Sequence, residues 1–371
     1  MSREVDVLVI YGTRPEIIKL SPLIVQLRTA LKSRLCVAAS GQHADLVQGV
    51  PELWNISPDL DLPIHRGAST AQLLASLIQG ISELLEDLQP KLVIVQGDTS
   101  TALAATLAAF SRSIPVAHVE AGLRSFDNLN PWPEEGFRRS IDGMSSILFA
   151  PTPNAESNLR TEQLPGLIRL SGNTIVDALT SIREVIRTDN SPVPLLPGHL
   201  QSGETPFVLF TQHRRESFGD NIERVFTAVQ TLAKRGKPVV FPVHPNPEVL
   251  SRAQRMLGGE PNITLLPPLN YLHFLKLLDT CNFVISDSGG LQEEVPSFGK
   301  RILITRTATE RPEILESGHG ILCGYETDRI VEQALRLVNL PSIVDTTNPF
   351  GDGHASERIC SDVCSFISQH S

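Results

Sequence analysis

Three carboxylates occur where a protein could use them as acids or bases. Asp98 and Glu120 each come shortly after an apolar run, and Glu134 closes a long loop that contains a tryptophan and two prolines. Carboxylates held on a rigid scaffold can remove a proton and return it. These positions indicate an acid/base site, although an acid at residue 134 is also typical of the first turn of a helix.

A second group of residues has the composition of an anion-binding turn. The apolar run 283–285 leads into a serine, an aspartate, Ser288, Gly289 and Gly290, and a helical pattern follows. A serine or aspartate can cap this helix, and the two glycines let a ligand approach the N–H groups at its positive end. Glu294, one turn later, could accept hydrogen bonds from ribose hydroxyls. A well-capped helix after a tight turn explains the same residues without a ligand.

Cationic side chains and a histidine are also placed to bind phosphate. Arg14 follows the first apolar run and Lys19 lies one turn beyond it, while His213 and Arg311 fall in loops of the second half. A cation about 4 Å from a phosphate oxygen contributes on the order of 4 kcal/mol at an effective dielectric of 20. A helix N-terminus contributes roughly 0.3–1 kcal/mol. The side-chain cations are therefore expected to dominate the stabilisation of a leaving phosphate.

The elements that must carry these residues alternate between strand and helix in two series. Helical periodicity is clearest over 70–88, where eight apolar side chains are expected to be buried. A stretch rich in proline and glycine, 188–204, indicates a linker or surface segment between the two series. Such alternation predicts an α/β protein of two Rossmann-like parallel-sheet domains that face a central cleft. The strands are expected at 5–10, 35–39, 91–95, 115–119, 147–150, 168–170, 207–210, 239–243, 263–265, 283–285 and 301–304.

Composition narrows the class of protein. A chain of 371 residues is long enough for two domains, and its net charge of -9 argues against nucleic acid or an anionic membrane as the main partner. The longest apolar runs are too short to cross a bilayer. Five cysteines without a dense framework, and no secretory segment, predict reduced thiols and a cytoplasmic protein. No CxxC or HExxH pattern supports a metal site, and the first turn lacks the GxGxxG of a nicotinamide-binding unit.

Nine short motifs occur here in the order in which they occur in one family. The motifs are Gly12-Thr-Arg-Pro-Glu16, Gly97-Asp-Thr99, His118-Val-Glu-Ala-Gly-Leu-Arg124, Pro131-Trp-Pro-Glu-Glu135, Gly172-Asn-Thr174, His213-Arg-Arg-Glu216, Pro242-Val-His-Pro245, Ser286-Asp-Ser-Gly-Gly290 and Thr309-Glu-Arg-Pro-Glu313. By these motifs the chain resembles the non-hydrolysing UDP-N-acetylglucosamine 2-epimerases over nearly its whole length.

The resemblance implies a fold of the glycosyltransferase-B type in a homodimer. It places an N-terminal domain that carries the carboxylates at 1–171 and a UDP-binding domain at 172–352, with a final helix at about 353–371 that packs back on the first domain. The implied reaction interconverts UDP-N-acetylglucosamine and UDP-N-acetylmannosamine by anti-elimination of UDP and re-addition through a 2-acetamidoglucal. No metal or cofactor is implied. A second UDP-N-acetylglucosamine molecule is a candidate effector.

The resemblance also implies roles for individual residues. Asp98, Glu120 and Glu134 would share the acid/base steps, with the face served by each left open. Substrate or UDP would contact Arg14, Lys19, His213, Phe274, Ser288, Gly289, Gly290, Glu294 and Arg311. Within this set, Phe274 would lie against the uracil and Glu294 would bind the ribose.

Some positions depart from the family pattern and keep alternatives open. Phe137, Leu269 and Thr307 stand where an asparagine, a glutamine and an aspartate are usual, and 44–46 replaces a basic, methionine-containing segment. A related UDP-N-acetylated deoxy or diacetamido sugar is an alternative substrate. A glycosyltransferase on the same scaffold is a less favoured alternative, because three carboxylates without an evident acceptor surface favour an isomerase.

Overall fold

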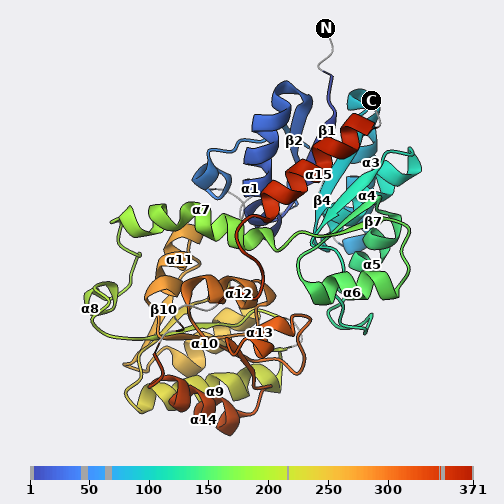
Figure 1. Cartoon of the computed structure of the whole chain (residues 1–371). Coiled ribbons are helices and arrows are strands. Elements are labelled where there is room, and N and C mark those ends of the chain that lie inside the picture. The colour runs from blue at the N-terminus through green and yellow to red at the C-terminus, as the bar shows by residue number, and fades with distance from the viewer. Residues whose placement is uncertain are drawn as a thin grey trace. The chain divides into compact units, whose positions relative to one another are not determined.

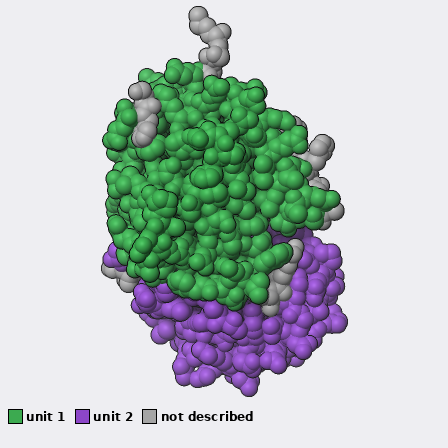
Figure 2. All heavy atoms as spheres, turned by 90° about the vertical axis from the view of Figure 1, so that its right-hand side faces the viewer, with its two compact units in different colours: residues 1–182, 350–371 green, residues 183–349 purple. Residues whose placement is uncertain are grey.

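The computed structural model describes residues 4–42, 49–62, 69–214, 217–341, 343 and 347–369. The chain divides into two compact units, coloured separately in Figure 2. Unit 1 comprises Met1–Ile182 and Phe350–Ser371, and unit 2 comprises Arg183–Pro349. The chain therefore leaves unit 1, builds unit 2 and returns to unit 1 at its C-terminal end.

Unit 1 is built on a sheet of seven parallel strands within its described residues, in the order β3-β2-β1-β4-β5-β6-β7. Strand β1 is buried along its whole length, as expected for a parallel strand covered by helices on both faces. The strands are β1 (Val7–Tyr11), β2 (Leu35–Ala39), β3 (Leu60–Asp61), β4 (Leu92–Gln96), β5 (Val116–Val119), β6 (Ile147–Ala150) and β7 (Leu167–Leu170). The helices are α1 (Arg14–Leu31), α3 (Thr70–Leu88), α4 (Ser100–Ser111), α5 (Glu134–Met144), α6 (Pro153–Thr161) and α7 (Thr174–Thr188), with short 3-10 helices at Lys32–Arg34 and Pro51–Trp54.

Unit 2 repeats this design with a parallel sheet that has six strands in the part of the chain described, in the order β10-β9-β8-β11-β12-β13. Its strands are β8 (Val208–Thr211), β9 (Val239–Pro242), β10 (Ile263–Leu266), β11 (Phe283–Ser286), β12 (Ile302–Ile304) and β13 (Gly320–Leu322). Its helices are α8 (Gly198–Gln201), α9 (Asp220–Lys234), α10 (Pro247–Leu257), α11 (Tyr271–Thr280), α12 (Gly289–Glu294), α13 (Glu313–Glu316) and α14 (Thr327–Leu337), with a 3-10 helix at Val295–Phe298.

The C-terminal helix α15 (Ala355–Gln369) belongs to unit 1 and packs beside α1 (Figure 1). Asp177 of α7 holds its first turn, since the carboxylate accepts hydrogen bonds from the N–H of Ala355 at 3.3 Å and of Ser356 at 2.7 Å. The Ser356 hydroxyl donates to the same carboxylate oxygen at 2.5 Å. An acid that receives the N–H groups of a first helical turn stabilises that helix end.

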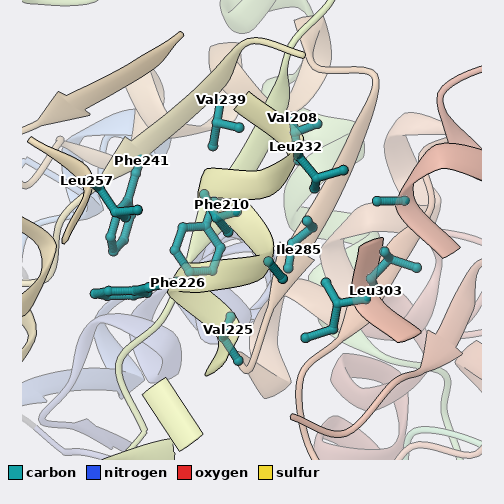
Figure 3. Packing of buried hydrophobic residues seen from close by; sticks show 14 of the residues in the cluster. Val208, Phe210, Val225, Phe226, Leu232, Val239, Phe241, Leu257, Ile285 and Leu303 are labelled. Carbon is teal, nitrogen blue, oxygen red and sulfur yellow. The ribbon is translucent and has the colours of Figure 1, made fainter. Parts of the chain in front are cut away.

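The core of unit 2 is centred on three phenylalanines, which Figure 3 shows among aliphatic side chains. Phe210 of β8 and Phe241 of β9 have ring centroids 4.5 Å apart, and Phe226 of α9 lies 5.8 Å from each ring in an edge-to-face arrangement. All three side chains are fully buried. Aromatic groups packed this way contribute both buried area and a favourable ring geometry, so this cluster holds α9 against the sheet.

The predicted strand and helix pattern is confirmed with small shifts at the ends, but it was incomplete, and the expected burial of α3 was wrong. The short edge strands β3 and β13 were not predicted, and α8 lies inside the segment predicted as a linker. In α3, only Leu77, Ile81 and Leu85 of the eight apolar residues are buried. A helix that covers one face of a sheet buries a narrow stripe, and its flanking positions remain partly exposed.

The described residues contain no helix that is both long and apolar enough to cross a membrane. They also contain no group of three or more histidine, cysteine or acidic side chains arranged to hold a metal ion. The five cysteines are all free thiols, and Cys364 is the one that is partly exposed.

Replacing Phe226 with alanine is expected to destabilise unit 2 by about 3–5 kcal/mol. The substitution would leave a cavity beside Phe210 and Phe241, and these rigid rings cannot move to fill it. Urea denaturation followed by circular dichroism measures the change. Phe110 on α4 is 59% exposed and provides the control, since Phe110→Ala is expected to change stability by less than about 0.5 kcal/mol. Equal losses in the two variants would contradict this view of the core.

Candidate functional site

The strand order of each sheet reverses beside its first strand, and the site residues gather there. In unit 1, β1 lies between β2 and β4, and in unit 2, β8 lies between β9 and β11. Open parallel sheets bind ligands at the carboxyl ends of strands where the order reverses. Arg14 is the first residue of α1, directly after the loop that follows β1, and Asp98 lies in the loop after β4. The loops after β8 and β11 carry His213 and Ser288.

Glu120 lies directly after β5 in a backbone conformation that non-glycine residues rarely adopt. Its φ is 70°, in the left-handed region. The conformation is held because its N–H donates to the carbonyl of Phe149 at 3.1 Å, while its carboxylate pairs with Lys19 and accepts from the amide of Gln96 at 2.8 Å. Unusual backbone geometry of this kind concentrates at functional sites, which supports a catalytic hypothesis for Glu120.

Asp98 is paired with Arg138, a residue of α5 that was not among the predicted site residues. The Arg138 guanidinium donates to Asp98 through Nε at 3.0 Å and also through Nη2, and its Nη1 lies 3.3 Å from Glu135. Glu135 is fully buried and accepts from the N–H of Ser125 at 3.0 Å and of Phe126 at 3.3 Å. One guanidinium therefore links Asp98 to the base of the loop that ends at Glu134, the first residue of α5.

A buried network beneath this loop joins the turns that carry Asp98 and Glu120. His118 of β5 contacts the carbonyl of Gly97 through Nε2 at 2.8 Å and Asp142 through Nδ1 at 2.6 Å. Asp142 also pairs with Arg124 at 2.7 Å. Burial would raise the pKa of Asp142, but the neighbouring His118 and Arg124 outweigh it and lower that pKa. The network fixes the backbone on both sides of the two carboxylates.

Glu16 connects the loop after β1 with the loop after β4. It is fully buried in α1, and its carboxylate accepts from the N–H groups of Gly12 at 3.1 Å and Thr13 at 2.7 Å and from the hydroxyl of Thr99 at 2.7 Å. Burial raises the pKa of Glu16 to about 7, and the hydrogen bonds from Thr13 and Thr99 counter this only in part. Glu16 thus links the backbone next to Arg14 with the turn that carries Asp98. The groups that donate these hydrogen bonds to Glu16 are neutral.

In unit 2, two guanidinium groups lie against the start of α12. A Cβ atom on Gly289 would lie 2.9 Å from Nη1 of Arg311 and 3.0 Å from Nη2 of Arg214, so a side chain there would displace them. Arg311 is paired with Glu293 and Glu310, and Arg214 lies 3.8 Å from Glu310. The structure therefore explains Gly289 by close packing, whereas Gly290 is exposed, with nothing nearer than 3.9 Å to the equivalent atom.

Helix α11 brings two further side chains to this region. Tyr271 donates from its hydroxyl to Glu294 at 2.9 Å, and both residues are buried. Phe274 lies one turn along the same helix and is partly buried. Ser288 caps α12 and accepts from the N–H of Leu291 at 3.4 Å, so the structure selects Ser288 from the three residues, Ser286, Asp287 and Ser288, that the sequence offered as caps.

The structure gathers the predicted residues into two sets, one in each unit. Unit 1 carries Arg14, Lys19, Asp98, Glu120 and Glu134, and unit 2 carries His213, Phe274, Ser288, Gly289, Gly290, Glu294 and Arg311. Their roles remain predictions. Arg215 and Glu216 of the motif that begins at His213, and the segment 44–46, lie outside the described residues.

The site residues that sequence reasoning missed are mostly partners of the predicted ones. They are Glu16, Gln96, Glu135, Arg138, Arg214, Tyr271, Asp287 and Glu293. Arg138 could have been predicted from the sequence. It follows Glu134 by four positions on one helix, so the two side chains lie on the same face of that helix. No local pattern indicated that Tyr271 would reach Glu294.

Comparisons with known proteins show the family to which this chain belongs. A family model for UDP-N-acetylglucosamine 2-epimerase matches residues 26–363. A relative from Ralstonia nicotianae, named probable UDP-N-acetylglucosamine 2-epimerase, is 42% identical over 367 residues, which cover 95% of this chain and 97% of the relative. A crystal structure of UDP-GlcNAc 2-epimerase from Neisseria meningitidis bound to UDP-GlcNAc superposes with a TM-score of 0.89 at 36% identity, covering 97% of this chain and 100% of that chain.

The glycosyltransferase SnogD from Streptomyces nogalater shares the fold at greater distance. Its TM-score is 0.57 at 15% identity, with 99% of this chain and 100% of that chain covered. A likeness at this identity concerns the fold alone. Together with the two parallel sheets, it confirms the predicted fold class of the glycosyltransferase-B type.

The stability of the protein is expected to depend on pH through Glu16. The pKa of Glu16 is raised from 4.5 to about 7 in the folded state, so the folded protein binds more protons and loses stability as pH rises between these values. Above pH 7 the loss is on the order of 3 kcal/mol. Glu16→Gln removes this dependence, and urea denaturation of both proteins from pH 5 to 8 measures the difference.

The exposed Glu184 of α7 provides a matched control. Glu184→Gln is expected to retain the pH dependence of the wild-type protein, because the substitution leaves the buried Glu16 in place. Stability curves that run parallel for wild type and Glu16→Gln would show that the Glu16 carboxyl titrates alike in the folded and unfolded chain.

Proposed function

Because the chain belongs to the UDP-N-acetylglucosamine 2-epimerase family, we propose that it is a non-hydrolysing isomerase that interconverts UDP-N-acetylglucosamine and UDP-N-acetylmannosamine. The observation that carries the proposal is the strand-end arrangement of Asp98 and Glu120, with Glu134 at the start of α5. The likeness to a structure whose name includes bound UDP-GlcNAc supports the substrate class.

The chemistry of the substrate determines the order of the steps. The C2 proton of a UDP-sugar has no neighbouring carbonyl group, so a carboxylate cannot remove it from the intact substrate. When the C1–O bond breaks, its electron pair leaves with UDP and positive charge develops at C1. A carboxylate then takes the C2 proton, and the C–H electron pair forms the C1=C2 bond of a 2-acetamidoglucal. Reversal with protonation on the opposite face of C2 gives the epimer.

The carboxylates of unit 1 supply the groups that this scheme needs. Removal and return of a proton on opposite faces requires two acid/base groups, and Asp98, Glu120 and Glu134 provide three candidates. Lys19 and Arg138 pair with Glu120 and Asp98 and hold these carboxylates in place before the substrate arrives. A site that is organised in advance loses little free energy to reorganisation during the reaction.

Residues of unit 2 would bind and stabilise the departing UDP. The Arg311 guanidinium lies against Gly289 at the start of α12, and we expect it to bind the diphosphate together with the His213 imidazole. Glu294, oriented by Tyr271, would accept hydrogen bonds from the ribose hydroxyls. Phe274 offers a ring for the uracil, on the same helix as Tyr271.

Incubation with UDP-N-acetylglucosamine in D2O is expected to place deuterium at C2 of both epimers, because the abstracted proton exchanges with solvent before it returns. NMR and mass spectrometry of the recovered UDP-sugars measure the incorporation. Complete retention of protium in an epimerised product would overturn the elimination scheme. Release of free sugar in proportion to turnover would identify a hydrolysing enzyme instead.

Asp98→Asn, Glu120→Gln and Glu134→Gln are each expected to lower kcat by roughly 10²–10⁴-fold, since an amide cannot accept the proton. UDP affinity, measured by calorimetry, should change only a few-fold because most of the proposed UDP contacts lie in unit 2. Asp127→Asn serves as the control, as Asp127 is an exposed acid of the same loop as Glu134. Full activity in all three amide variants would exclude this assignment.

A further inference from the structure

Asp287 is a fully buried carboxylate that joins the two strand-end loops of unit 2. It follows β11, and it accepts hydrogen bonds from the N–H of His213 at 3.1 Å, the N–H of Arg214 at 2.8 Å and the hydroxyl of Ser217 at 3.1 Å. All three donors belong to the loop after β8. The loops on the two sides of the strand-order reversal are therefore held together by one side chain.

The same carboxylate also contacts the ring of His213. Nδ1 of His213 lies 3.2 Å from Oδ1 of Asp287. Burial would raise the pKa of Asp287, but the charge and hydrogen bond of His213 and the backbone N–H groups lower it to about 2. An ionised carboxylate can only accept hydrogen bonds. Nδ1 of His213 must then carry the proton, and Nε2 is the nitrogen that remains to face a ligand.

A second histidine limits the rotation of this ring. His244, from the loop after β9, stacks on His213 with ring centroids 5.7 Å apart and planes inclined by 23°. Nδ1 of His244 accepts from the N–H of Asn246 at 3.2 Å and so carries no proton. The ring of His213 thus rests on a neutral imidazole on one side and is bonded to Asp287 through Nδ1.

The position of Asp287 places this contact beside the groups proposed to bind phosphate. Asp287 immediately precedes Ser288, the cap of α12, and Gly289 lies against the guanidinium groups of Arg214 and Arg311. The backbone N–H of Arg214 is bonded to Asp287 as well. A single carboxylate therefore orients both a histidine and the backbone of an arginine at the start of this helix.

We propose that Asp287 is a positioning residue for diphosphate binding: it accepts the Nδ1 hydrogen of His213 and so turns Nε2 toward the diphosphate of a UDP-sugar, where Nε2 must also carry a proton to donate to a phosphate oxygen. This inference rests on the proposed function for the identity of the ligand. Its structural content, the orientation and tautomer of His213, can be tested without substrate. A neutral imidazole can carry its proton on either ring nitrogen, and the hydrogen-bond partner of the ring decides which nitrogen carries it.

The test compares Asp287→Asn with the wild-type protein. Side-chain ¹H–¹⁵N spectra of ¹⁵N-histidine-labelled protein report the tautomer, and His213→Gln identifies the His213 signals by their loss. The wild type is expected to show an Nδ1–H ring, and Asp287→Asn to show a substantial Nε2–H population. Affinity for UDP is expected to fall about tenfold, a factor that corresponds to about 1.4 kcal/mol, whereas affinity for uridine should stay within about twofold.

Two control variants separate positioning of His213 from general support of the loop. Ser217→Ala removes another hydrogen bond to Asp287 but leaves the imidazole contact, so the tautomer should not change. Asp177→Asn alters an equally buried aspartate of unit 1, which also accepts from two backbone N–H groups and a serine hydroxyl. It should leave both the His213 spectrum and UDP affinity unchanged.

The outcomes distinguish this inference from the proposed function. An unchanged His213 tautomer in folded Asp287→Asn, or the same tautomer shift in Ser217→Ala, would overturn the positioning role. Equal losses of UDP and uridine affinity would overturn it also, because the effect would then not concern the diphosphate. If wild-type protein binds neither UDP nor a UDP-sugar, the proposed function fails, and the tautomer still decides whether Asp287 orients His213.

Discussion

The structure depends on two buried carboxylates, one at the strand-order reversal of each sheet. Parallel strands end at a common edge, where the loops that follow them leave backbone N–H groups without partners in the sheet. Glu16 accepts such groups in unit 1 and Asp287 in unit 2, and each also binds a hydroxyl from a loop or turn at the same edge. The loop before Arg14 and the loops that carry Asp98 and His213 are thereby held by side chains rather than by the sheet.

Glu16 and Asp287 both hold strand-end loops by accepting hydrogen bonds, but the charges around the two carboxylates differ. The donors to Glu16 among the described residues are neutral, and burial raises its pKa to about 7. Asp287 is equally buried, but the adjacent His213 and its backbone donors lower its pKa to about 2. Desolvation acts on both, so the charge of the neighbours decides the difference. Several other acids of the site have a cation beside them, as Glu120 has Lys19 and Glu293 has Arg311. Removing one member of such a buried pair is far more disruptive than its net contribution to stability suggests.

Much of the fold could be predicted from the sequence because buried parallel strands are continuous apolar runs and their helices begin at recognisable caps. Strands β2 and β6 have the predicted bounds, and α12 is capped by Ser288, one of three capping residues that the sequence offered. Strands β3 and β13 could not be found this way. Each is two or three residues long at a sheet edge, where pairing with one neighbour leaves too short an apolar pattern to detect. The breadth of the buried face of α3 was overestimated for a related reason, since periodicity identifies a face but does not measure how much of it the sheet covers.

By itself, the sequence determined the two-sheet architecture, the family, and the residue types that stand at the strand ends, because these follow from local patterns and from motifs read in order. Tertiary structure alone decided which side chains meet. The left-handed backbone of Glu120, the Arg138 bridge between Asp98 and Glu135, the Tyr271 contact with Glu294 and the orientation of His213 by Asp287 all join segments far apart in the chain or depend on such contacts. Contacts of this kind arise only when strand order and helix packing bring distant loops together. The spacing of residues along the sequence does not show the order of the strands in the sheet.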